Sequence, residues 1–329
     1  MKTIAFFNNK GGVGKTTLVY HVAWMMAELG HRVLAADLDP QANLSSMFLK
    51  EETLETLWPE DGPHSSVLAS VLPILEGIGD VGPALTQKVT ENLHLIPGDL
   101  GLSRFEDKLS DSWPRCLDRD SAAFRAVTAF YRIVKDGADA VGAEIALLDV
   151  GPNLGAINRS ALIAADHVIS PLAPDLYSLQ GLKNLGPTLQ DWRQGWTQRI
   201  DQKPENLDII LPFGRMNPAG YIVMQHVERK NRPVKAFQNW VHKIPKTYRE
   251  FVLDQPDGNI PEPDPYCLGM VRNYQSLVPM AQDARKPIFF LKSADGAIGA
   301  HAQSVTKCFS DFNRMTKAIL ETISLENDG

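Results

Sequence analysis

Residues 9–17, Asn-Lys-Gly-Gly-Val-Gly-Lys-Thr-Thr, constrain the fold more than any other segment of this chain. They follow a short apolar run at residues 4–7 and precede a helical pattern that starts near Lys15. A strand, a glycine-rich loop and a helix in this order are typical of a phosphate-binding loop. Glycines let the backbone aim its N–H groups at phosphate oxygens, and the helix N-terminus adds partial positive charge. The segment therefore predicts a nucleoside triphosphate site in an α/β protein.

Within this loop, Lys15 is expected to hold the β- and γ-phosphates of ATP and the Thr16 hydroxyl to ligate Mg²⁺. A dinucleotide fingerprint with Asp37 as its acid is a weaker interpretation, because its third glycine would fall on Thr17 and Lys15 would have no role. The common P-loop pattern has glycine where this chain has Asn9, and Lys10 adds a second lysine. The predicted nucleotide-binding residues of the loop are Lys10, Gly11, Gly12, Val13, Gly14, Lys15, Thr16 and Thr17.

Composition fits a large α/β protein of the cytoplasm. The 329 residues are 44% apolar and 22% charged, enough for one large domain or at most two. No apolar stretch approaches the roughly 18–20 residues that span a membrane, and the N-terminus is typical of a first strand and not of a signal peptide. Three widely separated cysteines indicate a reducing cytosol. The net charge of −6 means that nucleic-acid binding would need a local basic patch.

Continuous apolar runs alternate with helical patterns along the chain. Such runs fit strands that are buried on both faces of a parallel sheet. The alternation predicts a doubly wound, mostly parallel sheet flanked by helices, with ligands at the carboxyl ends of the strands. We interpret residues 1–329 as a single domain with insertions at roughly 50–90 and 214–266. Beyond residues 4–7, the expected strands are 32–37, 93–97, 145–149, 168–171, 207–213 and 288–291, and the expected helices are 16–29, 122–135, 179–196 and 302–323.

The segment KGGVGKTT resembles the "deviant" P-loop of the ParA/MinD group of ATPases. The resemblance implies that Lys10 reaches across a nucleotide-sandwich dimer to the phosphates of the partner. Its role would be like that of an arginine finger supplied in trans, worth roughly 10³–10⁵ in rate. The catalytic residues that it implies are Lys10, Lys15 and Asp39.

Two further segments are similar to the switch regions of that family. Residues 37–43 resemble the family's DxDPQGN motif, and Asp39 matches the position that orients the attacking water. Asp37 matches the position that supports the metal. Residues 145–155 resemble the Walker B strand and switch II, with Asp149 expected to reach Mg²⁺. Gly151 replaces the usual first proline of that loop, so we expect the loop to be looser. The predicted metal site is thus Thr16, Asp37 and Asp149.

Later stretches extend the resemblance loosely over nearly the whole chain. Residues 170–181 are similar to the family's strand-to-helix joint, and residues 271–287 to its closing "IPRN…GKPI" segment. Contacts to the base are expected from the loops after residues 207–213 and near Arg272, with Asn217 a candidate. A surface asparagine in a turn is the alternative interpretation for Asn217.

Basic and aromatic residues gather between Arg215 and Arg249 in this acidic chain. ParA relatives bind DNA without sequence preference through basic residues in the carboxyl half, so a DNA-binding segment is one interpretation. An ordinary solvated helix face is the other. The candidate DNA-binding residues are Arg229, Lys230, Arg232, Lys235, Lys243, Lys246 and Arg249.

The resemblance implies a ParA-type partitioning ATPase that forms an ATP-dependent homodimer, binds DNA and is released by a hydrolysis-stimulating partner or cargo adaptor. It would be cytoplasmic, or nucleoid-associated if it binds DNA. Because the chain begins at its first strand, we expect no amino-terminal operator-binding extension. A MinD-type membrane switch is disfavoured by the acidic C-terminus. A switch acting on a protein partner and a biosynthetic enzyme with the same P-loop are the remaining alternatives, since a nitrogenase iron-protein relative would need paired cysteines near the switches.

Overall fold

The apolar runs form the interior of one sheet in the computed structural model. Its strand order is β10-β7-β6-β1-β5-β2-β4-β3, and all neighbours are parallel except β3 and β4. The structure describes residues 1–226, 228–229, 232–233, 239–256, 260–274 and 276–325. The strands are β1 (Lys2–Phe6), β2 (Val33–Asp37), β3 (Gln87–Lys88), β4 (Leu93–Ile96), β5 (Ile145–Asp149), β6 (His167–Leu172), β7 (Asn217–His226) and β10 (Cys267–Arg272), with β8 (Glu228–Arg229) and β9 (Arg232–Pro233) forming a separate pair.

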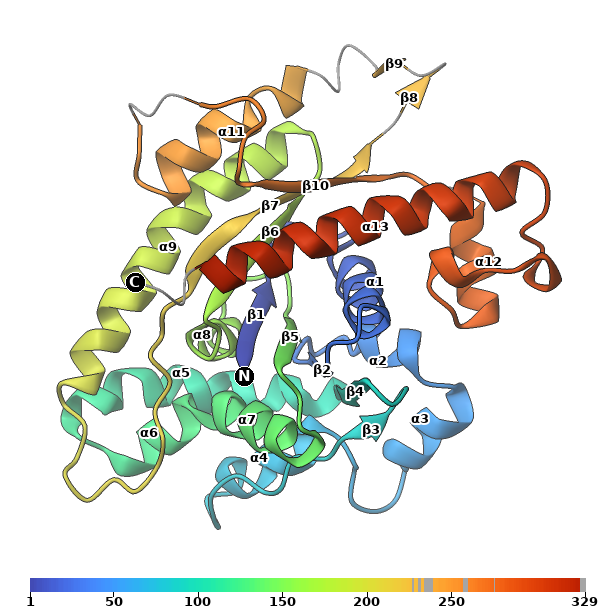
Figure 1. Cartoon of the computed structure of the whole chain (residues 1–329). Coiled ribbons are helices and arrows are strands. Elements are labelled where there is room, and N and C mark those ends of the chain that lie inside the picture. The colour runs from blue at the N-terminus through green and yellow to red at the C-terminus, as the bar shows by residue number, and fades with distance from the viewer. Residues whose placement is uncertain (227, 230–231, 234–238, 257–259, 275, 326–329) are drawn as a thin grey trace.

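Helices cover both faces of this sheet. On β1, Ile4 and Phe6 point into one core while Ala5 points into the other, as alternation along a strand requires, and Phe7 directly after the strand continues the pattern. Figure 1 shows α13 on the side of α1, whereas α5, α6 and α7 lie together away from it. The helices are α1 (Lys15–Glu28), α2 (Asn43–Phe48), α3 (Glu51–Leu57), α4 (Val67–Leu75), α5 (Phe105–Arg115), α6 (Ser121–Val127), α7 (Ala129–Val141), α8 (Ala156–Ile163), α9 (Leu176–Ile200), α11 (Ile244–Thr247), α12 (Leu277–Ala284) and α13 (Ala300–Leu325).

The doubly wound α/β architecture predicted from the sequence is confirmed, and two of the expected strands are wrong. Residues 207–213 are extended chain outside the sheet, and Ile288–Phe290 is a 3₁₀ turn. Apolar residues of both runs pack against the cores, although Ile210 and Phe213 are exposed, and an apolar run alone does not distinguish a strand from a loop on the core. In place of these two runs, the sheet contains β7 and β10. β7 lies within the segment 214–266 that the sequence indicated as an insertion.

The expected helices are present with altered boundaries. The helix expected at 122–135 is two helices, α6 and α7, which meet at Thr128. Its hydroxyl donates to the carbonyl of Phe124, 2.7 Å away. The segment 50–90 contains α3, α4 and the antiparallel edge strand β3.

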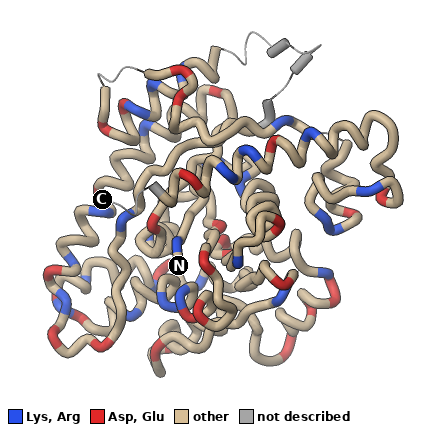
Figure 2. The backbone as a smooth tube through the Cα atoms, in the orientation of Figure 1, with Lys and Arg blue, Asp and Glu red and all other residues tan. Residues whose placement is uncertain are grey.

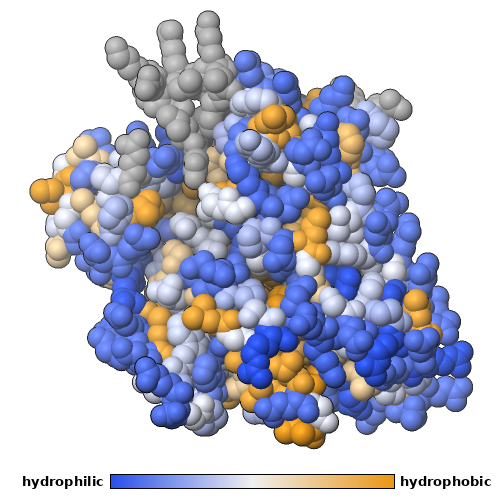
Figure 3. Space-filling model, turned by 180° about the vertical axis from the view of Figure 1, so that it is seen from behind, coloured by the Kyte–Doolittle hydropathy of each residue, from blue (hydrophilic) through white to orange (hydrophobic). Residues whose placement is uncertain are grey.

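Charge and hydropathy are mixed over the surface. Lys and Arg alternate with Asp and Glu along most of the tube in Figure 2. From behind, the surface is mostly hydrophilic, with hydrophobic residues in separate spots (Figure 3). In the described part of the chain, no helix has the length and apolar character needed to cross a membrane.

Candidate functional site

The carboxyl ends of β1, β2 and β5 bring the predicted residues to one edge of the sheet. Asp149 is the register partner of Phe6 on one side and of Asp37 on the other. The loop 7–14 leaves β1 at this edge and leads directly into α1. Parallel strands that end together create the crevice in which α/β proteins bind ligands. The fold therefore brings Asp149 to the P-loop, although Lys15 and Asp149 are 134 residues apart in the sequence.

The P-loop forms an open cradle at the N-terminus of α1. Gly12 and Gly14 have φ values of +74° and +88°, which favour glycine, and Gly14 caps α1 without a side-chain hydrogen bond. A Cβ built on Gly11 or Gly12 would meet no atom within 4 Å. A cavity of about 400 Å³ lies over the loop, lined also by Asp39 and Pro152 among others. Unsatisfied N–H groups and the helix dipole at this position suit a phosphate.

Lys15 lies inside the cradle and is 7% exposed. Its Nζ forms an ion pair with Asp149 Oδ1 and lies 4.0 Å from Asp39 Oδ2. Asp39 also accepts a hydrogen bond of 3.0 Å from the Gln41 N–H, which fixes the turn after β2. The Lys15 ammonium thus lies in the cavity proposed for the phosphates, and carboxylates of the same chain neutralise its charge. We call Lys15, Asp37, Asp39 and Asp149 the inner wall.

Two carboxylates of the inner wall are buried without enough positive charge around them. Burial and, after it, the nearby Asp149 carboxylate raise the pKa of Asp37 to about 7, although two hydrogen bonds from Ser45 oppose the rise. Burial also raises the pKa of Asp149, while Lys15 opposes the rise. Asp37 Oδ1 and Asp149 Oδ2 are buried and accept no hydrogen bond. Unpaired carboxylate oxygens beside a phosphate cradle fit a divalent cation.

Thr16 completes the donor set for such a cation. It follows Lys15 at the start of α1 and lines the same cavity as Asp39, and its side chain helps to lower the pKa of Asp149. No three His, Cys, Asp or Glu side chains of the described residues are grouped as a metal site by themselves. Mg²⁺ commonly takes one or two protein ligands together with phosphate oxygens and water, so the residues present fit Mg²⁺ bound together with a nucleotide.

Lys10 lies at the mouth of the cradle and points away from the inner wall. Its Nζ forms an ion pair with Asp175, the N-cap of α9, and lies 5.7 Å from the centre of the Tyr177 ring. Partial burial raises the pKa of Asp175, but hydrogen bonds from Lys10 and from the Ser178 N–H outweigh it and hold the pKa below its ordinary value. Three large apolar side chains nearby along this edge are exposed. We call Lys10, Leu154, Asp175, Leu176 and Tyr177 the rim.

The loop between Asp149 and α8 is tied down, so the expectation of a looser loop is wrong. The Gly151 N–H donates to Asn158 Oδ1 at 3.0 Å, and Asn158 Nδ2 donates back to the Gly151 carbonyl at 2.8 Å. A proline at position 151 could not make the first bond. Glycine in place of proline at position 151 therefore permits an additional hydrogen bond, from the Gly151 N–H to Asn158.

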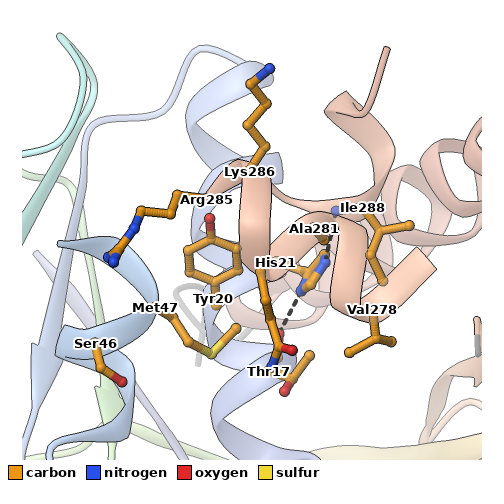
Figure 4. Close-up of a pocket in the computed structure, with 11 residues that line it drawn as sticks. Thr17, Tyr20, His21, Ser46, Met47, Val278, Ala281, Arg285, Lys286 and Ile288 are labelled. Carbon is orange, nitrogen blue, oxygen red and sulfur yellow. Dashed lines mark hydrogen bonds between the residues drawn. The ribbon is translucent and has the colours of Figure 1, made fainter. Parts of the chain in front are cut away.

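A second cavity of about 260 Å³ adjoins the cradle (Figure 4). Thr17, Ser46, Met47 and Gln282 line both cavities. In Figure 4, the side chains of α1 face α12 across this space, and Arg285 reaches over it toward α2. The Arg285 guanidinium donates to the carbonyl of Leu49, at the end of α2. The cavity continues the phosphate site into a partly apolar compartment.

His21 forms the back of this second cavity. Its Nδ1 lies 2.7 Å from the Thr17 carbonyl, and its Nε2 accepts a 3.1 Å hydrogen bond from the Ile288 N–H. This pattern requires a neutral ring that donates through Nδ1. Burial lowers its pKa to about 4, although the hydrogen bond to Thr17 opposes the shift. His21 therefore joins the first turns of α1 to the segment before α13.

Asn217 does not lie near the cradle, and its prediction as a base contact is wrong. It is the first residue of β7 and pairs with His167, the first residue of β6. Because these strands run parallel to β1, their amino ends lie at the edge opposite the P-loop. Its N–H donates to the carbonyl of Asp166. The apolar run at residues 207–213 predicts a strand followed by a loop at Asn217, whereas the strand of the sheet begins at Asn217 itself.

The basic segment divides into parts with different environments. Lys243 and Lys246 are exposed. Arg249 is 8% exposed, forms a 3.0 Å ion pair with Asp264 and lies over the Tyr266 ring. Its side chain is therefore not available to DNA, and its prediction as a DNA-binding residue is wrong. The remaining candidates lie outside the side chains that the structure describes. They are Arg229, Lys230, Arg232 and Lys235.

Sequence reasoning missed the partners of the predicted residues. The Asp175–Leu176–Tyr177–Ser178 stretch carries an N-cap signal, which could have placed Asp175 at a helix start. Nothing in the sequence indicates its ion pair with Lys10, 165 residues away. The hydrogen bonds of Ser45 to Asp37 and of Asn158 to Gly151 were likewise not predicted.

The fold and the site define a P-loop nucleotide-binding protein, and comparison with known proteins gives its family. A family model described as an AAA domain matches residues 1–202. The chain is 31% identical over 210 residues to the sporulation initiation inhibitor protein Soj of Bacillus subtilis (strain 168), covering 64% of this chain and 70% of Soj. The chain belongs to the ParA/MinD family of ATPases and to its partitioning branch of ParA- and Soj-like proteins.

Two further matches show how far the likeness extends. Protein IncC of Escherichia coli is 36% identical over 214 residues, which are 64% of this chain and 52% of IncC, so the chain spans about half the length of that relative. The crystal structure of protein DIP2308 from Corynebacterium diphtheriae has a TM-score of 0.74 at 24% identity and covers 99% of this chain and 100% of that one. This structure extends the likeness in fold over the whole chain.

Proposed function

We propose that this protein is a partitioning or positioning ATPase that binds ATP with Mg²⁺ and then closes on a second copy of itself in a nucleotide sandwich. Hydrolysis, stimulated by a partner, would open the dimer. The observation that carries the proposal is the division between two lysines of one loop. Lys15 faces the inner wall, whereas Lys10 points to the rim. A P-loop that served only its own chain would not need the second lysine.

The inner wall supplies the chemistry within one chain. Lys15 would exchange Asp149 for the β- and γ-phosphates, which relieves an ion pair that is buried. Thr16, Asp37 and Asp149 would hold Mg²⁺, which neutralises phosphate charge when bound. Asp39 would then be released from Lys15 and accept a hydrogen bond from the attacking water.

The rim supplies a surface for the second copy. Leu154, Leu176 and Tyr177 are 39%, 57% and 73% exposed beside the mouth of the cradle. Exposed apolar side chains around a site favour association, since burying them removes apolar area from water. In the single chain, Lys10 is held by Asp175, and a partner phosphate would compete for its ammonium.

The second cavity offers a place for the base of the nucleotide. It begins at Thr17, next to the phosphate cradle, and is walled by Tyr20, Met47 and Val278. Apolar walls with a few polar groups suit a heteroaromatic ring. Filling the space with Ala281→Trp should weaken ATP binding more than it weakens binding of inorganic triphosphate. Equal loss for the two ligands would place the base elsewhere.

DNA binding is the second part of the proposal. Its support is the local excess of Lys and Arg between residues 229 and 246 and the exposure of Lys243 and Lys246. Binding should depend on ATP, ignore base sequence and weaken steeply with salt, and each lost phosphate contact should lower the salt slope by about one. Replacing Arg229, Lys230 and Arg232 by alanine should weaken binding on all sequences. No DNA binding by the ATP-bound dimer would favour a switch that acts on a protein partner.

Size-exclusion chromatography with and without ATP tests the division of labour. Lys10→Ala should bind ATP, stay monomeric and hydrolyse poorly. Asp39→Ala should bind ATP and remain a trapped dimer, because the water is no longer oriented. If both variants elute alike, the separate roles of Lys10 and Asp39 are wrong.

A further inference from the structure

Asn158 holds the loop that follows Asp149. It is the third residue of α8 and is 1% exposed. Besides its two bonds to Gly151, its Nδ2 lies 2.6 Å from the Asn153 carbonyl and 3.0 Å from Asn153 Oδ1. The same Asn153 Oδ1 accepts from the Gly155 N–H at 2.8 Å. One buried amide thus connects two residues of the loop 150–155, Gly151 and Asn153, and Asn153 in turn holds Gly155.

Only an amide fits this position. The contacts require an acceptor for the Gly151 N–H and a donor for two carbonyls, which asparagine provides and aspartate or leucine does not. Asn158 Oδ1 can accept this hydrogen bond only because residue 151 is not a proline and has an N–H to donate. Gly151 and Asn158 are therefore matched to each other in this chain.

A second anchor holds the far end of the loop. α8 begins after Gly155, which provides no side-chain cap. Glu106 of α5 takes that role, with Oε1 2.6 Å from the Ala156 N–H and Oε2 2.9 Å from the Ile157 N–H. A carboxylate here also complements the helix dipole. In Figure 1, α5 and α8 are adjacent.

The loop so held lies beside the inner wall. A Cβ built on Gly151 would be in van der Waals contact with Asp39 Oδ1, at 3.6 Å, so Gly151 lies close to that carboxylate with no side chain between them. The Asp149 carbonyl accepts from the Leu38 N–H at 2.8 Å. A movement of the loop would therefore change the position of Asp39 relative to the phosphate site.

We infer that Asn158 is a positioning residue for hydrolysis, which fixes the Gly151 backbone against Asp39, with Glu106 holding the other end of the loop. The inference rests on the proposed ATPase function. It predicts an effect on the chemical step rather than on nucleotide binding, because Lys15 and the P-loop backbone do not contact Asn158.

The test compares Asn158→Leu with Ser160→Ala. Both residues are buried on α8, but Ser160 donates to the Val127 carbonyl on the side of α6 and not to the loop. Asn158→Leu should lower kcat about 10–100-fold, since small misplacements of catalytic groups cost rates of this order, and should change the Kd for ATP less than about threefold. Ser160→Ala should lower Tm without lowering kcat more than about twofold.

A second pair isolates the hydrogen bond. Gly151→Pro removes the N–H and Gly151→Ala retains it, and a Cβ there would be in ordinary contact with its neighbours. Gly151→Pro should lower kcat, and adding it to Asn158→Leu should lower kcat little further. Hydrogen exchange at the Gly151 amide should become about tenfold faster in Asn158→Leu. If the leucine variant does not fold, Asn158→Asp keeps the volume and the acceptor and loses the donor.

The outcomes separate the two proposals. A wild-type protein that binds ATP but never hydrolyses it refutes the proposed function, and the inference falls with it. An active wild type whose Asn158→Leu variant matches Ser160→Ala in kcat refutes the inference alone. So does a variant that loses ATP affinity in proportion to kcat, since that indicates a general structural role.

Discussion

The inner wall and the rim meet at the same loop but differ in how complete they are. The inner wall is buried, and its contacts lie within one chain: Lys15 forms an ion pair with Asp149, and Asp37 accepts hydrogen bonds from Ser45. The rim is exposed, and Lys10 pairs there with a carboxylate outside the inner wall. Under the proposed function, the single chain binds the nucleotide through the inner wall, and the rim serves the second copy.

The largest expected effect separates these regions by nucleotide affinity. Lys15→Ala should weaken ATP binding by at least about 100-fold, because it removes the only inner-wall cation from the phosphate site. Lys10→Ala should weaken binding to the monomer by less than about threefold. Titration calorimetry of both variants measures the difference, and similar losses would mean that the two regions are not distinct.

The contribution of His21, which joins α1 to the segment before α13, should be visible in the pH dependence of the free energy of unfolding. Because burial lowers the pKa of His21 to about 4, from an ordinary value of 6.5, only the unfolded chain takes up a proton between these values. This contribution to stability is complete above pH 6.5 and should be lost progressively as the pH falls to about 4, by about 3 kcal/mol at most. Urea unfolding of His21→Gln should lack that part of the slope; an unchanged slope would remove His21 as its source.

The rim should respond to the loss of its carboxylate. Asp175→Asn keeps the N-cap acceptor for the Ser178 N–H but removes the charge that holds Lys10. We expect ATP-dependent dimerisation to strengthen about 3–10-fold, in line with a partly exposed ion pair of about 1 kcal/mol. Analytical ultracentrifugation with ATP measures it. Weaker dimerisation would mean that Asp175 stabilises the dimer instead.

The smallest expected effect concerns the unpaired carboxylates. Asp37→Asn should raise the Tm of the nucleotide-free protein at pH 8 by a few degrees, since about 1 kcal/mol shifts the Tm of a large domain by roughly 2–4 °C. The sign follows from the raised pKa: ionising Asp37 in the fold costs stability as the pH rises from about 4 to about 7. With Mg²⁺ and ATP, the wild type should gain more Tm than the variant. A lower Tm for the nucleotide-free variant would contradict this reading of the site.

Local motifs predicted the parts of the molecule whose geometry is determined locally. The order of strand, loop and helix at residues 2–28 required only the nearby glycines and apolar spacing. Asp37 and Asp149 were predicted from the resemblance of their segments to the family's switch motifs, and the fold brings them together because each ends a buried strand and parallel strands end together. Residues 207–213 show the limit, because an apolar run packed on the core need not be hydrogen-bonded in the sheet. Asp175 and Asn158 act through partners that only the tertiary fold brings near.

Mixing two inactive variants tests most directly whether Lys10 acts across a dimer. In a heterodimer of Lys10→Ala and Asp39→Ala, one site combines Asp39 of the first chain with Lys10 of the second and is complete. An equal mixture, combined before ATP is added, should therefore regain ATPase activity. The rate would reach about half of the wild-type rate if every Lys10→Ala chain pairs with an Asp39→Ala chain, because each mixed dimer has one working site of two. If Lys10 acts only within its own chain, no heterodimer has a complete site, and the mixture will stay as inactive as its components.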